Sequence, residues 1–444
     1  MRARARAVRL GASWDRASAL RHSGARPSPF AEGRPKTEPM DESFDIIVVG
    51  AGAAGLAAAL ALESAGWRVA VVGRPDVGGQ ARTVALFDGS IRFLDALGAW
   101  ERVKHQSAAL RIMRIVDATD SIFRAQPASF DSHEIDLDAF GWNIENRTLV
   151  AALAELARAR AGLTFVEDFA QDLAIGPDAA TVTTRGGQNL SARLVVGADG
   201  RGSPMRAAAR IVAQTWDYPQ VALTAILAHS RPHDETSTEF HTREGPCTFV
   251  PLPGAPDAPE RSSLVWMMSR AQARRRHALA PEEFCAELSR LCQFFLGSMR
   301  LLSPLGFTPM HGLQARSLVA DRVALVGEAA HAFPPIGAQG LNLGLRDAAH
   351  LAQALEGASD PGAHEPLARY ADLRAGDVAS RSFGVDMLNR ALLSRSPVTD
   401  LLRGAGLSAL RRLAPLRKRA MREGVMPTQG APRIMLPQRA PENA

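Results

Sequence analysis

Short apolar runs alternate with helix-like stretches along the chain, and this alternation predicts an α/β fold. Residues 44–49, FDIIVV, are apolar and partly β-branched, which favours a buried strand. An Ala/Leu-rich stretch then continues to about Ala65 with the composition of a helix, and a second apolar run covers residues 67–72. Strand, helix and strand thus occupy about 30 residues, the length of one parallel βαβ unit.

The turn between the first strand and its helix reads GAGAAG. Gly50 would permit a tight turn, Gly52 would let a pyrophosphate approach the backbone, and Gly55 would let the helix pack on the strand. The flanking strand and helix make this a dinucleotide-binding signature, and the candidate site includes Ala53 and Ala54 between the last two glycines. The sequence therefore predicts a Rossmann-type domain.

One expected part of that signature is missing. A carboxylate at the end of the second strand usually binds the adenosine ribose, but the chain has Gly73 and Arg74 there. Asp76 is close enough to substitute, and Arg74 with water is the alternative. The sequence leaves this choice open.

A second strand, turn and helix occur late in the chain, in LVGEAAHAFPPIGAQGLNLGLRD. Residues 323–326 are short and apolar, and apolar residues recur at helical spacing over 341–355. Two prolines stiffen the turn, and its glycines let backbone come close to a ligand. Free amides at the helix start would form a partly positive floor for an electron-rich group. The residues of this candidate cradle are Pro335, Gly337, Gly340, Leu341 and Asn342. The alternative is an ordinary connection.

A third glycine cluster, GADGRGSPMR, follows an apolar run at residues 194–196 and contains Asp199. Alone it indicates an Asp-Gly turn. The segments 110–145 and 220–302 show strand-like alternation with polar breaks, as in LRIMRIVD and VALTAILAH.

Charge and composition exclude several classes of function. The net charge of +6 comes from residues 1–39, which hold nine Arg/Lys and three Asp/Glu, so that 43 residues of each sign remain from Met40 onward. The absence of net charge from Met40 onward argues against nucleic acid as a partner. No run approaches the about 18 apolar residues of a membrane span. The basic extension is a presequence, a tail, or an untranslated stretch before a start at Met40, and we favour the last.

Cysteine and histidine give little support for a metal site. The three cysteines, Cys247, Cys285 and Cys292, are too few for a disulfide framework, and core packing is the expectation for the last two. Histidines 229, 233 and 241 flank SRPHDETSTEF, which is polar enough to predict a loop. We therefore predict no metal.

In order along the chain, the three glycine clusters resemble the motifs of the single-component FAD-dependent aromatic hydroxylases, the para-hydroxybenzoate hydroxylase-like flavoproteins. Within that group, ARTVALFDGSIRFLDALGAW (81–100) and LRRLAPLRKRAMREG (410–424) look like the ubiquinone-biosynthesis hydroxylase branch. The resemblance covers roughly residues 43–424.

The resemblance implies roles for individual residues. The glycines of GAGAAG would hold the FAD pyrophosphate, Arg82 would serve the same phosphates, and Asp199 would brace the flavin end of the site. Glu328 stands where most of the family has Asp, and it would accept hydrogen bonds from the ribityl hydroxyls. Residues 335–342 would then lie along the isoalloxazine ring. No catalytic side chain is assigned.

The resemblance also implies a division of the chain. A discontinuous FAD-binding domain would comprise 43–109, 146–215 and 303–380, and an inserted mixed-sheet substrate domain would comprise 110–145 and 216–302. A C-terminal helical region is expected at 381–424, with disordered segments at 1–39 and 425–444.

The predicted function is FAD-dependent hydroxylation, with O2, of the ring of a polyprenyl phenol in ubiquinone biosynthesis. No second complete G-x-G-x-x-G is present, so NAD(P)H would bind transiently, or a donor protein would supply electrons. Leucines and arginines over 407–422 predict peripheral contact with the cytoplasmic face of a membrane, although Pro415 would break or kink one continuous helix there. A biosynthetic complex is a further expected partner.

Three other functions fit the same motifs. They are a soluble hydroxylase of small aromatic acids, a flavin-dependent reductase of isoprenoid double bonds, and a non-catalytic flavin-binding component of a complex. The mass of the product separates the first two, because one adds oxygen and the other adds hydrogen.

Overall fold

The computed structural model describes residues 42–78, 82–119, 126–334, 338–377, 413–425 and 430–437. Within these residues the strands form sheets of eight, nine and three strands. The basic extension 1–39 and most of the expected helical region 381–424 lie outside the described residues.

The eight-stranded sheet is built around the first expected strand. β1 (Glu42–Val49) lies between β2 (Val69–Val72) and β11 (Asn189–Gly197) and is parallel to both, and α1 (Ala53–Ser64) connects β1 to β2. The predicted βαβ unit is therefore confirmed. The other strands of this sheet are β8 (Leu163–Val166), β9 (Ala170–Ile175), β10 (Ala180–Thr184), β18 (Val319–Ala320) and β19 (Val323–Leu325).

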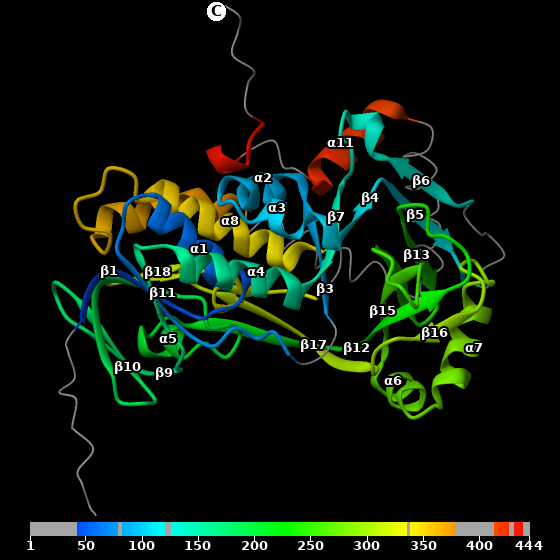
Figure 1. Ribbon diagram of the computed structural model, residues 1–444, viewed down its shortest axis with the longest axis horizontal. Coiled ribbons are helices and arrows are strands. Elements are labelled where there is room, and N and C mark those ends of the chain that lie inside the picture. The colour runs from blue at the N-terminus through cyan, green and yellow to red at the C-terminus, as the bar shows by residue number, and fades with distance from the viewer. Residues whose placement is uncertain are drawn as a thin grey trace, which may run out of the picture. The chain divides into compact units, whose positions relative to one another are not determined.

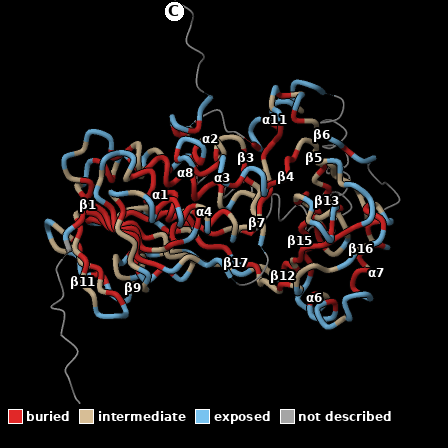
Figure 2. Tube along the Cα trace, viewed as in Figure 1, coloured by how far each residue is buried: buried red, intermediate tan, exposed pale blue. Residues whose placement is uncertain are grey.

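Helices cover one face of this sheet and a β-hairpin covers the other. Figure 1 shows α1, α4 (Asn146–Ala159) and α8 (Gln339–Ala354) on one side, with β9, β10 and α5 (Pro204–Ala208) opposite. Ile46 and Val48 pack towards the helices, while Ile47 and Val49 pack towards the hairpin, as alternation along a strand requires. Buried residues concentrate in these central strands and in α1 (Figure 2).

The nine-stranded sheet gathers strands from distant parts of the sequence. Its long central strand β12 (Ala213–His229) pairs antiparallel with β15 (Arg261–Ser269) and β17 (Gly306–Ala315). The remaining strands are β5 (Ile112–Asp117), β6 (Ala128–Asp131), β13 (Thr236–Thr242), β14 (Gly245–Leu252), β16 (Met299–Leu301) and β20 (His331–Ala332). One face packs against α6 (Arg270–His277) and α7 (Pro281–Leu291). Its core includes all three cysteines: Cys247 of β14, Cys285 of α7, and Cys292 just after α7.

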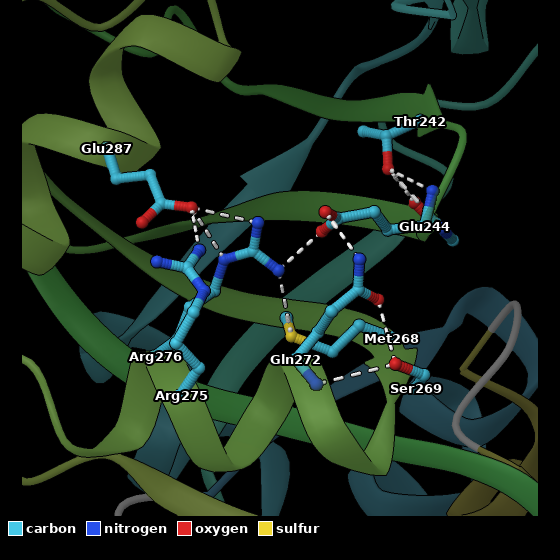
Figure 3. Close-up of polar contacts among 9 residues, drawn as sticks. Thr242, Glu244, Met268, Ser269, Gln272, Arg275, Arg276 and Glu287 are labelled. Carbon is cyan, nitrogen blue, oxygen red and sulfur yellow. Dashed lines mark hydrogen bonds and ion pairs between the residues drawn. The ribbon is translucent and has the colours of Figure 1, made fainter.

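A buried arginine fixes α6 to this face. Arg276 lies 4.1 Å above the Trp266 ring, and its guanidinium pairs with Glu244 of the β13–β14 turn and with Glu287 of α7 (Figure 3). Gln272 also reaches Glu244, at 2.7 Å. The buried charge is thus matched from two neighbouring elements, which a buried guanidinium requires.

A small sheet lies between the two large ones. β3 (Thr83–Phe87) pairs with β7 (Gly141–Glu145), which also pairs with β4 (Ser107–Leu110). Thr83 donates to Ser263 of β15 at 2.8 Å, and Asn143 donates to the Pro251 carbonyl at 2.8 Å, so both strands are tied to the nine-stranded sheet. Nearby short helices are α2 (Asp88–Ala96), α3 (Trp100–Val103), η1 (Lys104–Gln106) and η2 (Ser132–Ile135).

Several local expectations differ from the structure. The polar stretch expected as a loop becomes strand β13 from Thr236, because alternate residues such as Phe240 are buried against α7. β17 hydrogen-bonds into the nine-stranded sheet although it lies within 303–380, so sheet pairing does not follow that boundary. The division into domains stays a prediction.

The expected disorder of 425–444 does not hold for residues 430–437. The 3₁₀ turn η4 (Arg433–Met435) packs on α2 and α8, and Met435 is buried among their apolar residues. The Arg433 amide donates to the Gln353 side chain at 3.0 Å. A buried apolar side chain and polar contacts of Arg433 thus hold this Pro-rich segment on α2 and α8.

The described part of the C-terminal region is α11 (Ala414–Val425). Pro415 does not break it, because the helix begins one residue earlier and a proline in the first turn removes no intrahelical hydrogen bond. No helix within the described ranges combines the length and the apolar character that crossing a bilayer needs.

Candidate active site

The three glycine clusters meet at one edge of the eight-stranded sheet. β1, β11 and β19 are parallel neighbours, so the turns that follow them lie side by side. A Cβ on Gly50 would lie 2.2 Å from the Ala198 carbonyl oxygen, and the Ala54 side chain packs against Gly327 and Gly344. The structure thus brings together turns that begin at Gly50, Gly197 and Gly327 and are far apart in the sequence.

The glycines of these turns differ in what surrounds them. A Cβ on Gly55 would lie 2.0 Å from the Gly50 carbonyl oxygen, and Gly50 itself has a φ of +119°, so both positions require glycine for the fold. A Cβ on Gly52 or on Gly340 would meet nothing within 4 Å. Open space above these two backbones fits a cofactor that lies against them.

The Asp199 carboxylate accepts hydrogen bonds from residues of its own turn. Its Oδ1 accepts from the Ser203 hydroxyl at 2.5 Å, and its Oδ2 accepts from the Met205 amide at 3.0 Å. Burial raises the pKa of Asp199 above its ordinary value, while these two donors act in the opposite direction. The residue therefore shapes the turn before α5, and its predicted contact with the flavin stays a prediction.

A cavity of about 190 Å³ separates the turns from the nine-stranded sheet. Arg201 and Glu328 line it from the turns, with Arg201 Nε 3.2 Å from Glu328 Oε2, and Arg82 lines it from just before β3. From the sheet it is lined by Ala222, Thr224, Ser263, Val265, Thr308 and Met310, among others. The sequence identified Arg82 and Glu328, but only strand alternation pointed to the sheet residues.

A larger groove, of about 570 Å³, is not the same site. Its lining comes from the carboxyl ends of α1 and α8 and from Arg433 and Ile434. Both helices begin at the glycine turns, so this groove lies at their opposite ends. We assign the candidate site to the smaller cavity.

Asn342 holds the start of α8 in place. Its Oδ1 accepts from the Phe87 amide at 2.9 Å and from the Ser90 hydroxyl at 2.7 Å, and its Nδ2 donates to the carbonyls of Ala85 and Ala338. The Asn342 side chain therefore has a structural role, whereas the sequence analysis proposed its backbone N–H as a contact for the ligand. Leu341 is partly buried against the core, and Pro335 and Gly337 lie outside the described residues.

A buried charge cluster lies beside the Gly327 turn, and the sequence analysis assigned no role to its members. Asp347 of α8 accepts from Gly327 N at 2.8 Å and from Arg374 Nε at 2.7 Å, and its Oδ2 lies 2.7 Å from His331 Nε2. All three side chains are fully buried. Although burial acts to raise it, the pKa of Asp347 is held below its usual value by His331 and Arg374.

Gly73 and Arg74 follow β2, where a ribose-binding acid is expected. Gly73 packs closely on Ala51 of the glycine turn, where a Cβ would lie 2.7 Å from the Ala51 nitrogen. Arg74 turns away, donating to the Glu167 carbonyl at 3.1 Å and lying over the Phe169 ring. Asp76 is exposed just beyond and stays the candidate carboxylate.

The histidines near Cys247 make hydrogen bonds to other protein groups. His229 contacts the Arg231 carbonyl at 2.8 Å and the Ser262 hydroxyl at 2.9 Å, and His241 contacts Glu239 at 2.8 Å. Over the described ranges, no three His, Cys, Asp or Glu side chains are grouped to hold a metal.

Comparison with known proteins gives consistent results. Residues 43–380 match the FAD binding domain family. The chain is 34% identical to the ubiquinone hydroxylase UbiL of Rhodospirillum rubrum, over 91% of this chain and 95% of that protein. It is 30% identical to the 3-demethoxyubiquinol 3-hydroxylase of Escherichia coli, over 86% of this chain and 98% of that protein.

A solved structure supports the same fold. The p-nitrophenol 4-monooxygenase PnpA from Pseudomonas putida superposes with a TM-score of 0.71 at 20% identity, covering 86% of this chain and 97% of that one. The predicted Rossmann-type fold with a mixed sheet against it is confirmed by this likeness.

Proposed function

We propose a function from one premise: the chain belongs to the FAD binding domain family, whose model matches residues 43–380. On that premise it is an FAD-dependent monooxygenase that hydroxylates the aromatic ring of a polyprenylated phenol in ubiquinone biosynthesis. The observation that carries the substrate class is its 34% identity to a ubiquinone hydroxylase over 91% of the chain.

The described residues fit FAD. Gly52 and Gly340 leave open space where a cofactor would lie, and Arg82 and Glu328 line the cavity between them and the nine-stranded sheet. The pyrophosphate would lie on the Gly50 to Gly55 turn, the ribityl chain near Glu328, and the ring system along the start of α8. Bound there, FAD supplies the electron transfer and the activation of O2.

The protein's own contribution is to position the ring and exclude water. Ala222, Val265 and Met310 give the sheet side of the cavity an apolar surface, with Thr224 and Thr308 beside them. Such a wall orients an aromatic ring and keeps water from the reacting atoms. The arrangement suits a reaction whose chemistry belongs to the cofactor.

The electron donor is proposed to be NAD(P)H, bound transiently, or a redox partner protein. The sequence contains one complete G-x-G-x-x-G, at Gly50 to Gly55, which the FAD site uses. A second nucleotide would therefore bind without a dedicated domain.

We further propose that α11 brings the enzyme to the cytoplasmic face of a membrane that holds the substrate. Leu413 and Leu416 are 54% and 46% exposed, and Lys418 and Arg419 are exposed beside them. Met421 and Val425 instead pack on Phe130 and its neighbours. Exposed apolar area next to cations is what an anionic lipid surface attracts. Leu407, Leu410, Arg411 and Arg412 lie outside the described residues.

The function is tested by deleting the gene from its host and analysing the quinones extracted from the deletion strain. We expect a polyprenyl precursor that lacks one ring oxygen to accumulate, and plasmid-borne wild-type chain to restore the end product. An unchanged quinone profile would reject the assigned pathway. A precursor that differs in isoprenoid saturation would indicate a reductase.

A further inference from the structure

Gln220 lies on the face of β12 that borders the cavity. Towards β15 the strand pairing is regular, with Gln220 opposite Ser269 and Ala222 opposite Met267. Alternation therefore places the Gln220 side chain on the same face as Ala222 and Thr224, which line the cavity, while Gln220 itself lies next to Ala222 on that face, behind the lining residues. Towards β17 the register shifts between Asp217 and Val221, so Gln220 belongs to an irregular stretch.

The Gln220 amide is buried without a partner. The residue is 3% exposed, and neither Oε1 nor Nε2 has a hydrogen-bond partner among the described residues. Ala222, Met267 and Met310 form an apolar cluster on this face, with Phe333 packed against it. An amide left unpaired inside a protein costs about 1 to 3 kcal/mol, so a position that keeps one without use is unfavourable for stability.

On the opposite face of the same sheet, the charged and amide side chains near Glu244 are paired. There Arg276 is 3% exposed, and its guanidinium is paired with Glu244 and Glu287 (Figure 3). Gln272 of α6 donates to Glu244, and its Oε1 accepts from the Ser269 hydroxyl at 2.9 Å. Thr238 Oγ1 and Trp266 Nε1 of this sheet also lack a hydrogen-bond partner among the described residues, but each is a single polar atom, whereas Gln220 leaves both polar atoms of its amide unpaired.

We propose that the Gln220 carboxamide binds a ring hydroxyl of the aromatic substrate. An amide offers both a donor and an acceptor, and a phenolic hydroxyl needs both. The ring would lie against the apolar cluster, and the hydrogen bonds would select the oxygen-bearing edge of the ring. This assignment rests on the proposed function, because it takes a phenol as the substrate.

The first test measures stability without substrate. Gln220→Leu removes an unpaired amide and keeps the side-chain volume, so it should raise the Tm of the FAD-saturated protein by about 2 °C. Gln272→Leu is the matched control, because it removes a paired amide and should lower the Tm. A lower Tm for Gln220→Leu would show that the amide is paired in the folded protein, and would overturn the inference.

The second test measures binding through the change in flavin absorbance. The probes are 2-prenylphenol and prenylbenzene, which lacks the hydroxyl. Gln220→Leu should bind 2-prenylphenol about tenfold more weakly than wild type and prenylbenzene equally well. Equal binding of 2-prenylphenol by both proteins would overturn the inference and leave the proposed function intact.

Two further outcomes are informative. Loss of FAD from Gln220→Leu would place the amide against the flavin and so overturn its assignment to the substrate. If wild-type protein neither binds nor hydroxylates 2-prenylphenol, the proposed substrate class itself is rejected, and the role given to Gln220 is rejected with it.

Discussion

The Oδ2 atom of Asp347 lies 2.7 Å from Nε2 of His331, with both side chains fully buried. This contact joins α8 to the strand that follows the Gly327 turn, and the Gly327 amide donates to the same oxygen. A carboxylate in the middle of α8 thus fixes the turn that is proposed to hold the ribityl chain.

Asp347→Asn should destabilise the protein by about 3 to 5 kcal/mol. The change leaves Arg374 buried with one carboxylate fewer, and removing one partner of a buried pair is costly. Urea unfolding at fixed FAD concentration measures the effect, because bound ligand also contributes to stability. The control is Asp76→Asn, an exposed change that should stay within about 0.5 kcal/mol. Equal midpoints for the two variants would contradict the structural role of Asp347.

His350 should make the protein acid-sensitive over a defined range of pH. Burial lowers the pKa of His350 from 6.5 to about 4. Between these values the unfolded chain binds a proton that the folded protein does not, so stability falls as the pH drops from 6.5 to 4. The total loss is on the order of 3 kcal/mol.

Unfolding free energies measured at intervals across that pH range test this. His350→Gln should flatten the curve, whatever its effect on stability at pH 7. His364→Gln, which changes an exposed histidine, should leave the slope unchanged. The prediction is wrong if wild type and His350→Gln lose stability in parallel.

Gly340→Val should remove FAD while the fold survives. The space beside Gly340 is open, so a side chain there meets no protein atom but occupies the place proposed for the cofactor. Gly344→Val is the matched control on the same helix, since its Cβ would lie 3.2 Å from both Ala54 Cβ and Gly327 Cα. It should lose about 1 to 3 kcal/mol of stability through overpacking.

The readouts for this pair are the flavin content after gel filtration and the urea midpoint of FAD-free protein. Gly340→Val should keep the wild-type midpoint and lose the flavin. Normal flavin content in that variant would move the cradle away from the start of α8.

Much of this arrangement was predictable from the sequence, because local patterns carry it. FDIIVV, GAGAAG and the apolar repeat of α8 identify β1, its turn and the late helix, and parallel strands then place the turns together. The Asp347 cluster was not predictable. Its members are polar, so they contribute to neither the helical nor the strand repeat of apolar residues, and they pair with residues up to 27 positions away.

Other features depend on side chains that no pattern reveals. Gln220 is polar at a buried position, and Met435 is buried against α2 and α8 although it lies in a Pro-rich segment. Arg417 was expected to face a membrane, but it pairs with Glu134 and lies over Phe130. Helical spacing predicted the repeat of apolar and basic residues in α11, but not which face of the helix packs against the protein.

The exposed face of α11 should bind anionic vesicles. Lys418→Glu with Arg419→Glu should weaken binding by about thirtyfold or more at low salt, at about 1 kcal/mol per basic residue removed. Arg270→Glu with Arg274→Glu makes the same charge change on α6, which lies far from α11 (Figure 1), and should have little effect.

Co-sedimentation with phosphatidylserine vesicles measures this binding. Arg417→Glu is a further comparison, because it should lower stability by breaking the contact with Glu134. If both double variants sediment like wild type, or if wild type does not bind, α11 has a structural role only.

The most direct measurement of the central claim combines the cofactor and the product. Purified protein, loaded with FAD and given a reductant and isotopically heavy O2, is incubated with a polyprenylphenol, and the product is analysed by mass spectrometry. We predict yellow protein and a product that has gained one oxygen atom derived from O2. Colourless protein that takes up no added FAD, or a product that gains no oxygen, would contradict the account.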